Sequence, residues 1–153
     1  MSQRKLRLGA FIMATGHHVA GWRHPGAQAD SGINIDHYIQ VAQTAERGLF
    51  DQVFVADTPG LWHNGDDESL SRQGRVSTFE PVTLWAALSA VTKRIGFVAT
   101  ASTTYEEPYL LARKFASLDH LSKGRAAWNV VTTASENVYG NFCLLYTSPS
   151  PRD

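Results

Sequence analysis

Apolar and polar residues follow two patterns along the chain, short apolar runs and longer segments with helical spacing. Four apolar runs have the length of β-strands, and between them three segments place an apolar residue every three or four positions. The expected strands are residues 6–13, 52–56, 95–100 and 125–131. Strand and helix therefore alternate in the order β-α-β-α-β-α-β, with a repeat of roughly 40 residues.

The three helical segments carry sequence signals for their ends. In residues 34–47 the apolar positions fall on one helical face, and Gly48 is well placed to end this helix. These apolar positions are Ile35, Ile39, Ala42, Ala45 and Leu49. The other two helices are expected to begin at residues 80–81 and 107–108, because proline suits the first turn, where its missing N–H would have been unpaired. The third helix is expected to end near residues 123–124.

This element order predicts an α/β fold with parallel strands joined by right-handed helical crossovers. A TIM barrel needs eight strand–helix units and typically ~250 residues, so the chain supplies about half of one. A complete doubly wound sheet could also be built from this length, and the pattern alone leaves both architectures open. The Gly-x-Gly-x-x-Gly phosphate turn does not follow the first expected strand, which counts against a dinucleotide-binding sheet.

Composition narrows the functional classes. The 153 residues contain 14 Lys and Arg against 14 Asp and Glu, and like charges do not cluster, so we propose neither nucleic acid nor membrane as a partner. No stretch approaches the ~20 apolar residues that a membrane span needs. The single cysteine, Cys143, excludes an internal disulfide framework, and the cytoplasm is the expected compartment.

The last eleven residues break the pattern. After Phe142 the helix and strand spacing stops, and residues 143–153 resemble an in-frame translation of an adapter used in sequencing libraries. An ordinary disordered tail rich in serine and proline is the alternative. We therefore expect a truncated domain over residues 1–142 and a non-native, disordered tail over residues 143–153.

Polar and aromatic residues collect directly after each expected strand. These segments are residues 15–25, 57–63, 102–105 and 132–133. Ligands of parallel α/β folds bind beyond the carboxyl ends of the strands. We therefore expect the four segments to converge on one rim and to form a single site.

Six short motifs follow one another along the chain, some in these rim segments and some between them. They are residues 16–25 (GHHVAGWRHP), 54–58 (FVADT), 79–81 (FEP), 100–105 (TASTTY), 118–125 (LDHLSKGR) and 128–133 (WNVVTT). The ordered set resembles the FMN-dependent monooxygenases of the bacterial-luciferase-like group, in the branch that contains the nitrilotriacetate and dibenzothiophene-sulfone enzymes. The match runs from about residue 5 to Phe142. It implies the N-terminal half of a TIM barrel, with four parallel strands and three crossover helices.

The resemblance also implies a chemistry and a set of partners. These enzymes oxidise a small organic substrate with O2 and reduced FMN, which a separate NAD(P)H-dependent flavin reductase supplies. The full-length enzyme is expected to be a homo-oligomer. The later flavin contacts and the phosphate-binding loop of the family would lie beyond Phe142, so we expect the chain to be a fragment that is inactive alone.

Six residues match flavin-binding positions of the family. They are Asp57 after the second strand, Ser102 and Thr103 at the third, and Asn129, Thr132 and Thr133 at the fourth. From their own chemistry, His17, His18 and Arg23 could orient an anionic or polar substrate, and Trp22 could form an apolar wall. No side chain is assigned a catalytic role.

Each assignment has a plainer alternative. Asp57 could cap the following turn, and Ser102 and Thr103 could simply end a β-strand. Several basic side chains are expected on a solvated helix face and loop, namely Arg113, Lys114, Lys123 and Arg125. The fragment could also be non-catalytic, because an open sheet has two edges that invite pairing with other chains.

A metal-dependent hydrolase on a similar barrel is the main rival function. Five histidines lie near the expected site, at positions 17, 18, 24, 37 and 63. However, the adjacent His17 and His18 would point to opposite sides of an extended segment, so they could not bind one metal together. The motifs His-x-His and His-Glu-x-x-His are both absent from the sequence.

Overall fold

The computed structural model describes residues 5–18, 20–61, 68, 76–133 and 136–142. The expected tail 143–153 and His63 lie outside the described residues, and the assignment of that tail stays a prediction. The strands are β1 (Gly9–Phe11), β2 (Gln52–Val55), β3 (Gly96–Ser102) and β4 (Ala126–Val131). The helices are α1 (Ile35–Arg47), α3 (Pro81–Ser89), α4 (Pro108–Ser122) and the short α5 (Glu136–Tyr139), with 3-10 turns at Gly21–Arg23 and Gly140–Phe142.

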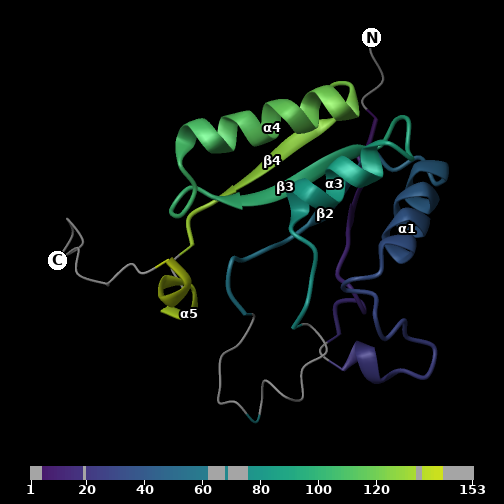
Figure 1. Ribbon diagram of the computed structural model, residues 1–153. Helices are drawn as coiled ribbons and strands as arrows, with labels where there is room; N and C mark the ends of the chain where they lie inside the picture. Colours follow the sequence, from purple (N-terminus) through teal and green to yellow (C-terminus); the bar gives the residue numbers. More distant parts are fainter. Residues whose placement is uncertain (1–4, 19, 62–67, 69–75, 134–135, 143–153) are drawn as a thin grey trace.

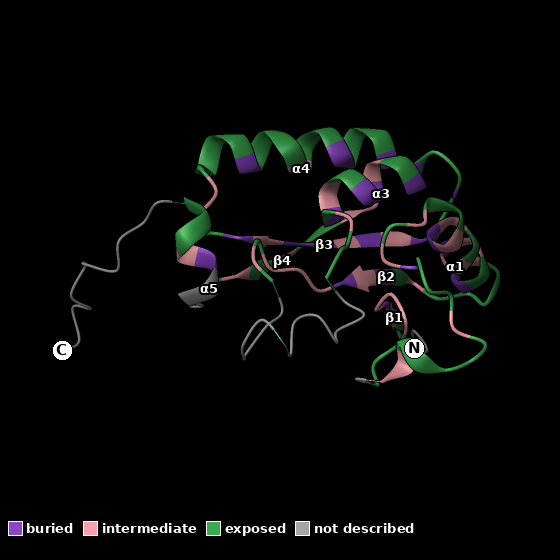
Figure 2. Cartoon of the chain, turned by 60° about the horizontal axis from the view of Figure 1, so that its bottom comes forward, coloured by how far each residue is buried: buried purple, intermediate pink, exposed green. Residues whose placement is uncertain are grey.

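The four strands form one parallel sheet in the order β1-β2-β3-β4 (Figure 1). Among the described residues, the crossover helices α1, α3 and α4 lie between successive strands along the chain. The predicted α/β fold of four parallel strands with three crossover helices is therefore confirmed. In Figure 2, α3 and α4 lie on the same side of the sheet.

The strand register gives the sheet two different faces. Val53 pairs with Phe97, and both side chains are fully buried on the face that the helices cover. One residue further along, Phe54 pairs with Val98, and these side chains point to the opposite face because strand residues alternate. Thr100 on β3 pairs with Asn129 on β4 and lies on that same second face.

Side-chain capping explains where α1 and α3 begin, and α4 likewise begins at a proline, Pro108. The Asn34 side chain accepts the His37 N–H at 3.1 Å and caps α1. The Glu80 carboxylate accepts the N–H groups of Val82 and Thr83, each at 2.8 Å, while Pro81 occupies the first turn of α3. The helix starts predicted at the two Glu-Pro pairs are therefore confirmed.

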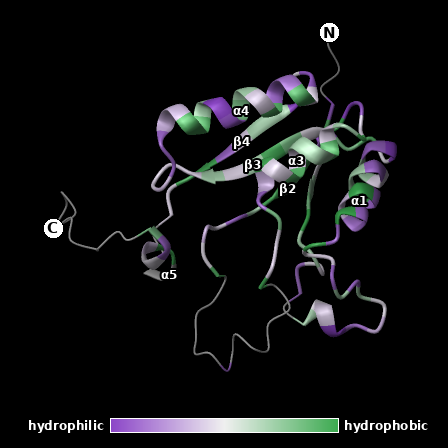
Figure 3. Ribbon diagram, in the orientation of Figure 1, coloured by the Kyte–Doolittle hydropathy of each residue, from purple (hydrophilic) through white to green (hydrophobic). Residues whose placement is uncertain are grey.

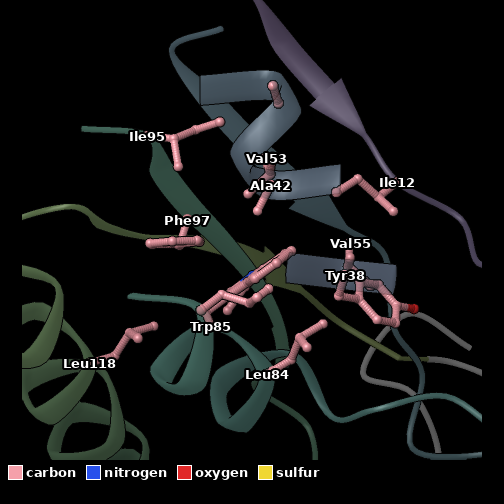
Figure 4. Close-up of a cluster of buried hydrophobic side chains, with 13 residues drawn as sticks. Ile12, Tyr38, Ala42, Val53, Val55, Leu84, Trp85, Ile95, Phe97 and Leu118 are labelled. Atoms are coloured by element: carbon pink, nitrogen blue, oxygen red, sulfur yellow. The ribbon is translucent and has the colours of Figure 1, made fainter. Parts of the chain in front are cut away.

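The core lies between the sheet and the helices. Figure 4 shows its side chains converging from β2, β3 and the three crossover helices. Trp85 is fully buried, packs against Phe97 with ring centroids 5.4 Å apart, and donates its indole N–H to the Val98 carbonyl at 2.9 Å. Hydrophobic residues concentrate in the strands and α3, whereas α4 mixes both kinds (Figure 3). Among the described elements, the crossover helices therefore pack on one face of the sheet.

Three expectations need correction, on the first strand, on Leu49 and on Arg125. The first strand is shorter than residues 6–13, because only Gly9–Phe11 pair residue by residue with β2, while Leu6 and Leu8 lie before the strand and are exposed. Leu49 was expected on the apolar face of the first helix, but it follows Gly48 at the helix end with φ 61° and is 77% exposed. A left-handed residue leaves the helical path, so its side chain no longer follows the helical spacing.

Arg125 was expected in a solvated loop, and this was wrong. Its guanidinium is partly buried and donates to the carbonyls of Ser89 at 2.9 Å, Ile95 at 2.8 Å and Ser122 at 2.6 Å. It also lies 5.0 Å from the centroid of the Phe97 ring. Arg125 therefore ties the ends of α3 and α4 to the start of β3.

Candidate functional site

A cavity opens at the carboxyl ends of β2 and β3. Its volume is about 290 Å³. It is lined by Asp57, Thr58, Pro59, Thr78, Glu80, Thr100, Ala101, Ser102, Tyr105, Glu106 and Phe142. In Figure 1 the segment after β2 and the short α5 after β4 both lie below the sheet. Residues far apart in the sequence thus meet where ligands of parallel α/β folds bind.

Asp57 is the first charged residue after β2 and lies partly buried in this cavity. Burial raises the pKa of its carboxyl to about 6, against an opposing hydrogen bond from the Thr58 N–H and with help from the nearby Glu80 carboxylate. Asp57 is therefore about half protonated near pH 6, whereas at pH 7 only about a tenth of it carries the proton. In that form the side chain can donate a hydrogen bond as well as accept one.

Glu80 contributes a second carboxylate to the cavity, but its oxygens are already engaged. They accept the N–H groups of Val82 and Thr83, and Oε2 also accepts the Thr83 hydroxyl at 2.6 Å. A carboxylate at a helix N-terminus is stabilised by the helix dipole. Glu80 therefore caps the N-terminus of α3, and its negative charge helps to raise the pKa of Asp57.

Thr100 and Ser102 lie two residues apart on β3, so they point to the same face. The Thr100 hydroxyl donates to the Val55 carbonyl at 2.8 Å and accepts the Asn129 amide at 3.1 Å. The Ser102 hydroxyl lies 2.9 Å from the Thr133 hydroxyl. These bonds connect β2, β3 and β4 at the level of the cavity and fix its floor.

Tyr105 brings an aromatic wall from the loop after β3. Its ring stacks on Phe142 with centroids 4.2 Å apart and an interplanar angle of 16°. The Tyr105 hydroxyl is buried and has no hydrogen-bond partner. Desolvation and the nearby Tyr139 raise the pKa of the Tyr105 phenol. The cavity therefore contains a neutral, unpaired hydroxyl.

The structure brings only part of the predicted flavin-binding set to this cavity. Asp57 and Ser102 line it, and Asn129 and Thr133 support it through their bonds to Thr100 and Ser102. Thr103 lies instead at a second, apolar hollow of about 200 Å³. The other residues of that hollow are Glu106, Pro108, Leu111, Ala112, Phe115 and Trp128. Thr132 is exposed and lines none of the cavities described here.

The substrate-side candidates lie elsewhere on the loop after β1. The His17 Nε2 lies 3.0 Å from the Phe11 carbonyl, and its ring meets the Phe11 ring edge-on. His18 and Arg23 line an open hollow of about 580 Å³, and the Arg23 guanidinium lies 5.9 Å from the Trp22 ring. This hollow shares no lining residue with the cavity at Asp57.

Reasoning from the sequence gave no individual role to most of the residues that line the cavity. Glu80, Thr100, Tyr105 and Phe142 are among them. Thr100 could have been found from strand alternation, because it lies two positions before Ser102 on the same face. Tyr105 and Phe142 meet only through the tertiary fold, and no sequence spacing indicates that contact.

The described residues contain no group of three or more histidine, cysteine or acidic side chains arranged to hold a metal ion. Within the same part of the chain, no helix is both long and apolar enough to cross a membrane.

The chain is similar to known proteins over nearly all its length. It is 50% identical over 140 residues to N-acetyl-S-(2-succino)cysteine monooxygenase of Bacillus subtilis (strain 168), covering 92% of this chain and 30% of that protein. It is 42% identical over 147 residues to nitrilotriacetate monooxygenase component A of Aminobacter aminovorans, covering 92% and 32%. The chain thus spans about a third of the length of the curated relatives it matches.

The chain is also similar to a solved structure over most of its length. The crystal structure of riboflavin lyase with modified FMN and its substrate riboflavin superposes with a TM-score of 0.81 at 37% identity. This similarity covers 93% of the present chain and 33% of that protein. The fold matches the N-terminal part of the TIM-barrel enzymes of this group. The sequence profile described as luciferase-like monooxygenase matches residues 10–152, and the chain belongs to this family.

Proposed function

We propose that this chain is the flavin-binding part of a two-component monooxygenase that uses reduced FMN and O2 to oxidise a small organic substrate. The observation that carries the proposal is the cavity at the ends of β2 and β3, which a partly buried Asp57 lines together with aromatic and hydroxyl side chains. The names of the relatives support the reaction class, since two are monooxygenases and one of them is a component of a larger system.

The cavity fits a flavin ring in its chemistry. An isoalloxazine ring needs an apolar slot with a few oriented donors and acceptors. Tyr105 and Phe142 supply aromatic surface, and Asp57 and the unpaired Tyr105 hydroxyl supply polar groups. The similar riboflavin lyase structure contains modified FMN, which agrees with this use of the fold.

The residues of the chain would hold the cofactor and shape its surroundings. When bound, reduced FMN supplies the reaction with O2, and the protein supplies binding, orientation and electrostatics. Asp57 and Ser102 would hold the ring in the cavity, with Asn129 and Thr133 fixing the floor through Thr100 and Ser102. The stacked rings of Tyr105 and Phe142 would keep water away from the site. Thr103 and Thr132 lie outside this cavity, and they would contact the flavin only if its binding site extends beyond the cavity.

The substrate and protein partners complete the proposal. His18 and Arg23 line the open hollow after β1 and offer donors to an anionic or polar substrate, with His17 and Trp22 as neighbours. A separate NAD(P)H-dependent flavin reductase would supply the reduced FMN. We further propose a cytoplasmic location and a homo-oligomeric full-length enzyme.

Flavin titration of the full-length protein tests the proposed function. We expect the protein to bind FMN, and Asp57→Ala to raise the dissociation constant about tenfold or more, because a hydrogen-bonding side chain is removed from the cavity. Asp119→Ala on the exposed face of α4 is the control and should leave binding unchanged. A protein that binds no FMN, or an Asp57→Ala variant that binds it as tightly as the wild type, would contradict the proposal.

A further inference from the structure

Most polar groups around the cavity are already committed to partners within the protein. The Glu80 oxygens accept N–H groups at the start of α3, and Glu106 forms an ion pair with Lys114 at 2.8 Å. Thr100 and Ser102 are bonded to neighbouring strands. These bonds hold the walls of the cavity in place and engage most of its polar side chains.

The buried hydroxyl of Tyr105 has no such partner. Three buried side-chain oxygens have no hydrogen-bond partner within the described part of the chain, on Thr15, Ser31 and Tyr105, and only Tyr105 lines this cavity. Buried polar groups in folded proteins are nearly always paired, and an unpaired one calls for an explanation. A bound ligand that supplies the missing partner is such an explanation.

The position of Tyr105 is set independently of its hydroxyl. The ring stacks on Phe142 at 4.2 Å and lies 6.2 Å from the Tyr139 ring, so two aromatic contacts orient it. Desolvation and Tyr139 raise the pKa of the phenol, so it stays protonated at neutral pH and can donate. Isoalloxazine carbonyl oxygens and ring nitrogens are acceptors for such a donor.

We propose that Tyr105 is a cofactor-binding residue whose hydroxyl forms a hydrogen bond with the flavin ring held in this cavity. The inference rests on the proposed function and adds to it a residue outside the six that match the family's flavin-binding positions. The hydroxyl costs stability while the cavity lacks a flavin and contributes to binding once the flavin is present.

Tyr105→Phe in the full-length protein separates these two effects, because the variant keeps the stacked ring and removes only the hydroxyl. We expect the dissociation constant for FMN to rise about three- to tenfold, the loss of one hydrogen bond. The absorbance spectrum of bound FMN should also shift relative to the wild type. Without FMN, the melting temperature should stay the same or rise. Tyr109→Phe, at a 77% exposed tyrosine on α4, is the matched control and should change none of these quantities.

Two results would overturn the inference while leaving the proposed function intact. One is unchanged FMN binding by Tyr105→Phe in a protein that binds FMN and loses binding on Asp57→Ala. The other is a lower melting temperature of Tyr105→Phe in the absence of FMN, because the hydroxyl would then have a partner inside the protein. If the wild-type protein binds no FMN at all, both the proposed function and this inference are wrong.

Discussion

The Thr100 hydroxyl accepts a hydrogen bond from the Asn129 amide at 3.1 Å and donates its own proton to the Val55 carbonyl at 2.8 Å. One side chain thus joins β2, β3 and β4 just beneath the cavity. Thr100 is buried, so water cannot replace these bonds. Asn129 therefore supports the floor of the cavity through its hydrogen bond to Thr100.

Thr100→Val should therefore destabilise the protein although its size is nearly unchanged. Both hydrogen bonds are lost, and the Asn129 amide faces a methyl group, so the free energy of unfolding should fall by about 1–3 kcal/mol. Urea denaturation measures this change. Thr104→Val, at an exposed position just beyond β3, should change the free energy by less than about 0.5 kcal/mol. Equal effects of the two substitutions would show that the buried bonds do not matter.

Asp57 should make stability depend on pH in an unusual direction. Its pKa is raised from 3.8 to about 6, so the folded state disfavours the ionised carboxylate. Stability is therefore lost as the pH rises from about 4 through 6, and the loss persists at higher pH. Asp57→Asn should raise the free energy of unfolding at pH 7 by up to about 3 kcal/mol and leave it nearly unchanged near pH 4.

Thermal unfolding of Asp57→Asn and the wild type at several pH values tests this prediction. Asp119→Asn on the exposed face of α4 is the control and should show no such trend. A constant difference between Asp57→Asn and the wild type from pH 4 to pH 7 would mean that the pKa of Asp57 is not raised.

Arg125 should be the most important basic residue for stability at the opposite end of the sheet. Arg125→Met removes the bonds to the Ser89, Ile95 and Ser122 carbonyls while keeping an apolar stem. We expect the free energy of unfolding to fall by about 2–4 kcal/mol. Arg113→Met on the exposed face of α4 should have little effect. Chemical denaturation of both variants decides whether buried bonding or the loss of positive charge is responsible.

Glu46 should stabilise the folded state at neutral pH, and this stabilisation should be lost in acid. One of its oxygens accepts the N–H groups of Lys93 at 2.9 Å, Arg94 at 2.5 Å and Ile95 at 3.0 Å. Burial raises the pKa of Glu46, but these three donors and the Arg94 charge outweigh it, so the pKa is lowered below 4.5. The stabilisation is therefore present above the unfolded value and is lost as the pH falls through the lower, folded value.

Glu46→Gln should accordingly lower the free energy of unfolding by about 1–2 kcal/mol at pH 7, with a smaller difference below pH 4. The comparison uses thermal unfolding at both pH values. Glu107→Gln, at an exposed residue without a side-chain cap, provides the control. A difference that grows as the solution is acidified would contradict the assigned role.

Local features of the sequence predicted most of the fold. The strand and helix positions follow from apolar spacing, and the helix starts at Glu80 and Glu107 follow from the proline after each glutamate. Capping and periodicity act over a few residues, so a single segment contains the information. Leu49 departs from this rule, because its positive φ lies just beyond the helix end.

The candidate site was predicted only in part, because it depends on contacts between segments. That Asp57 and Ser102 would lie near each other follows from the rule that parallel strands end at one rim. The choice between Ser102 and Thr103 depends on which way each side chain points, and strand alternation sends adjacent residues to opposite faces. Only the structure assigns Ser102 to the cavity and Thr103 to the apolar hollow.

The sequence by itself determined the parallel α/β order of strands and helices, and it identified the rim where polar residues collect. The tertiary structure alone decided that Tyr105 stacks on Phe142 with its hydroxyl unpaired, and that Arg125 is bound by carbonyls from two helix ends. The physical reason is the range of the forces involved. Helix and strand formation respond to neighbours along the chain, whereas burial and hydrogen bonding respond to neighbours in space.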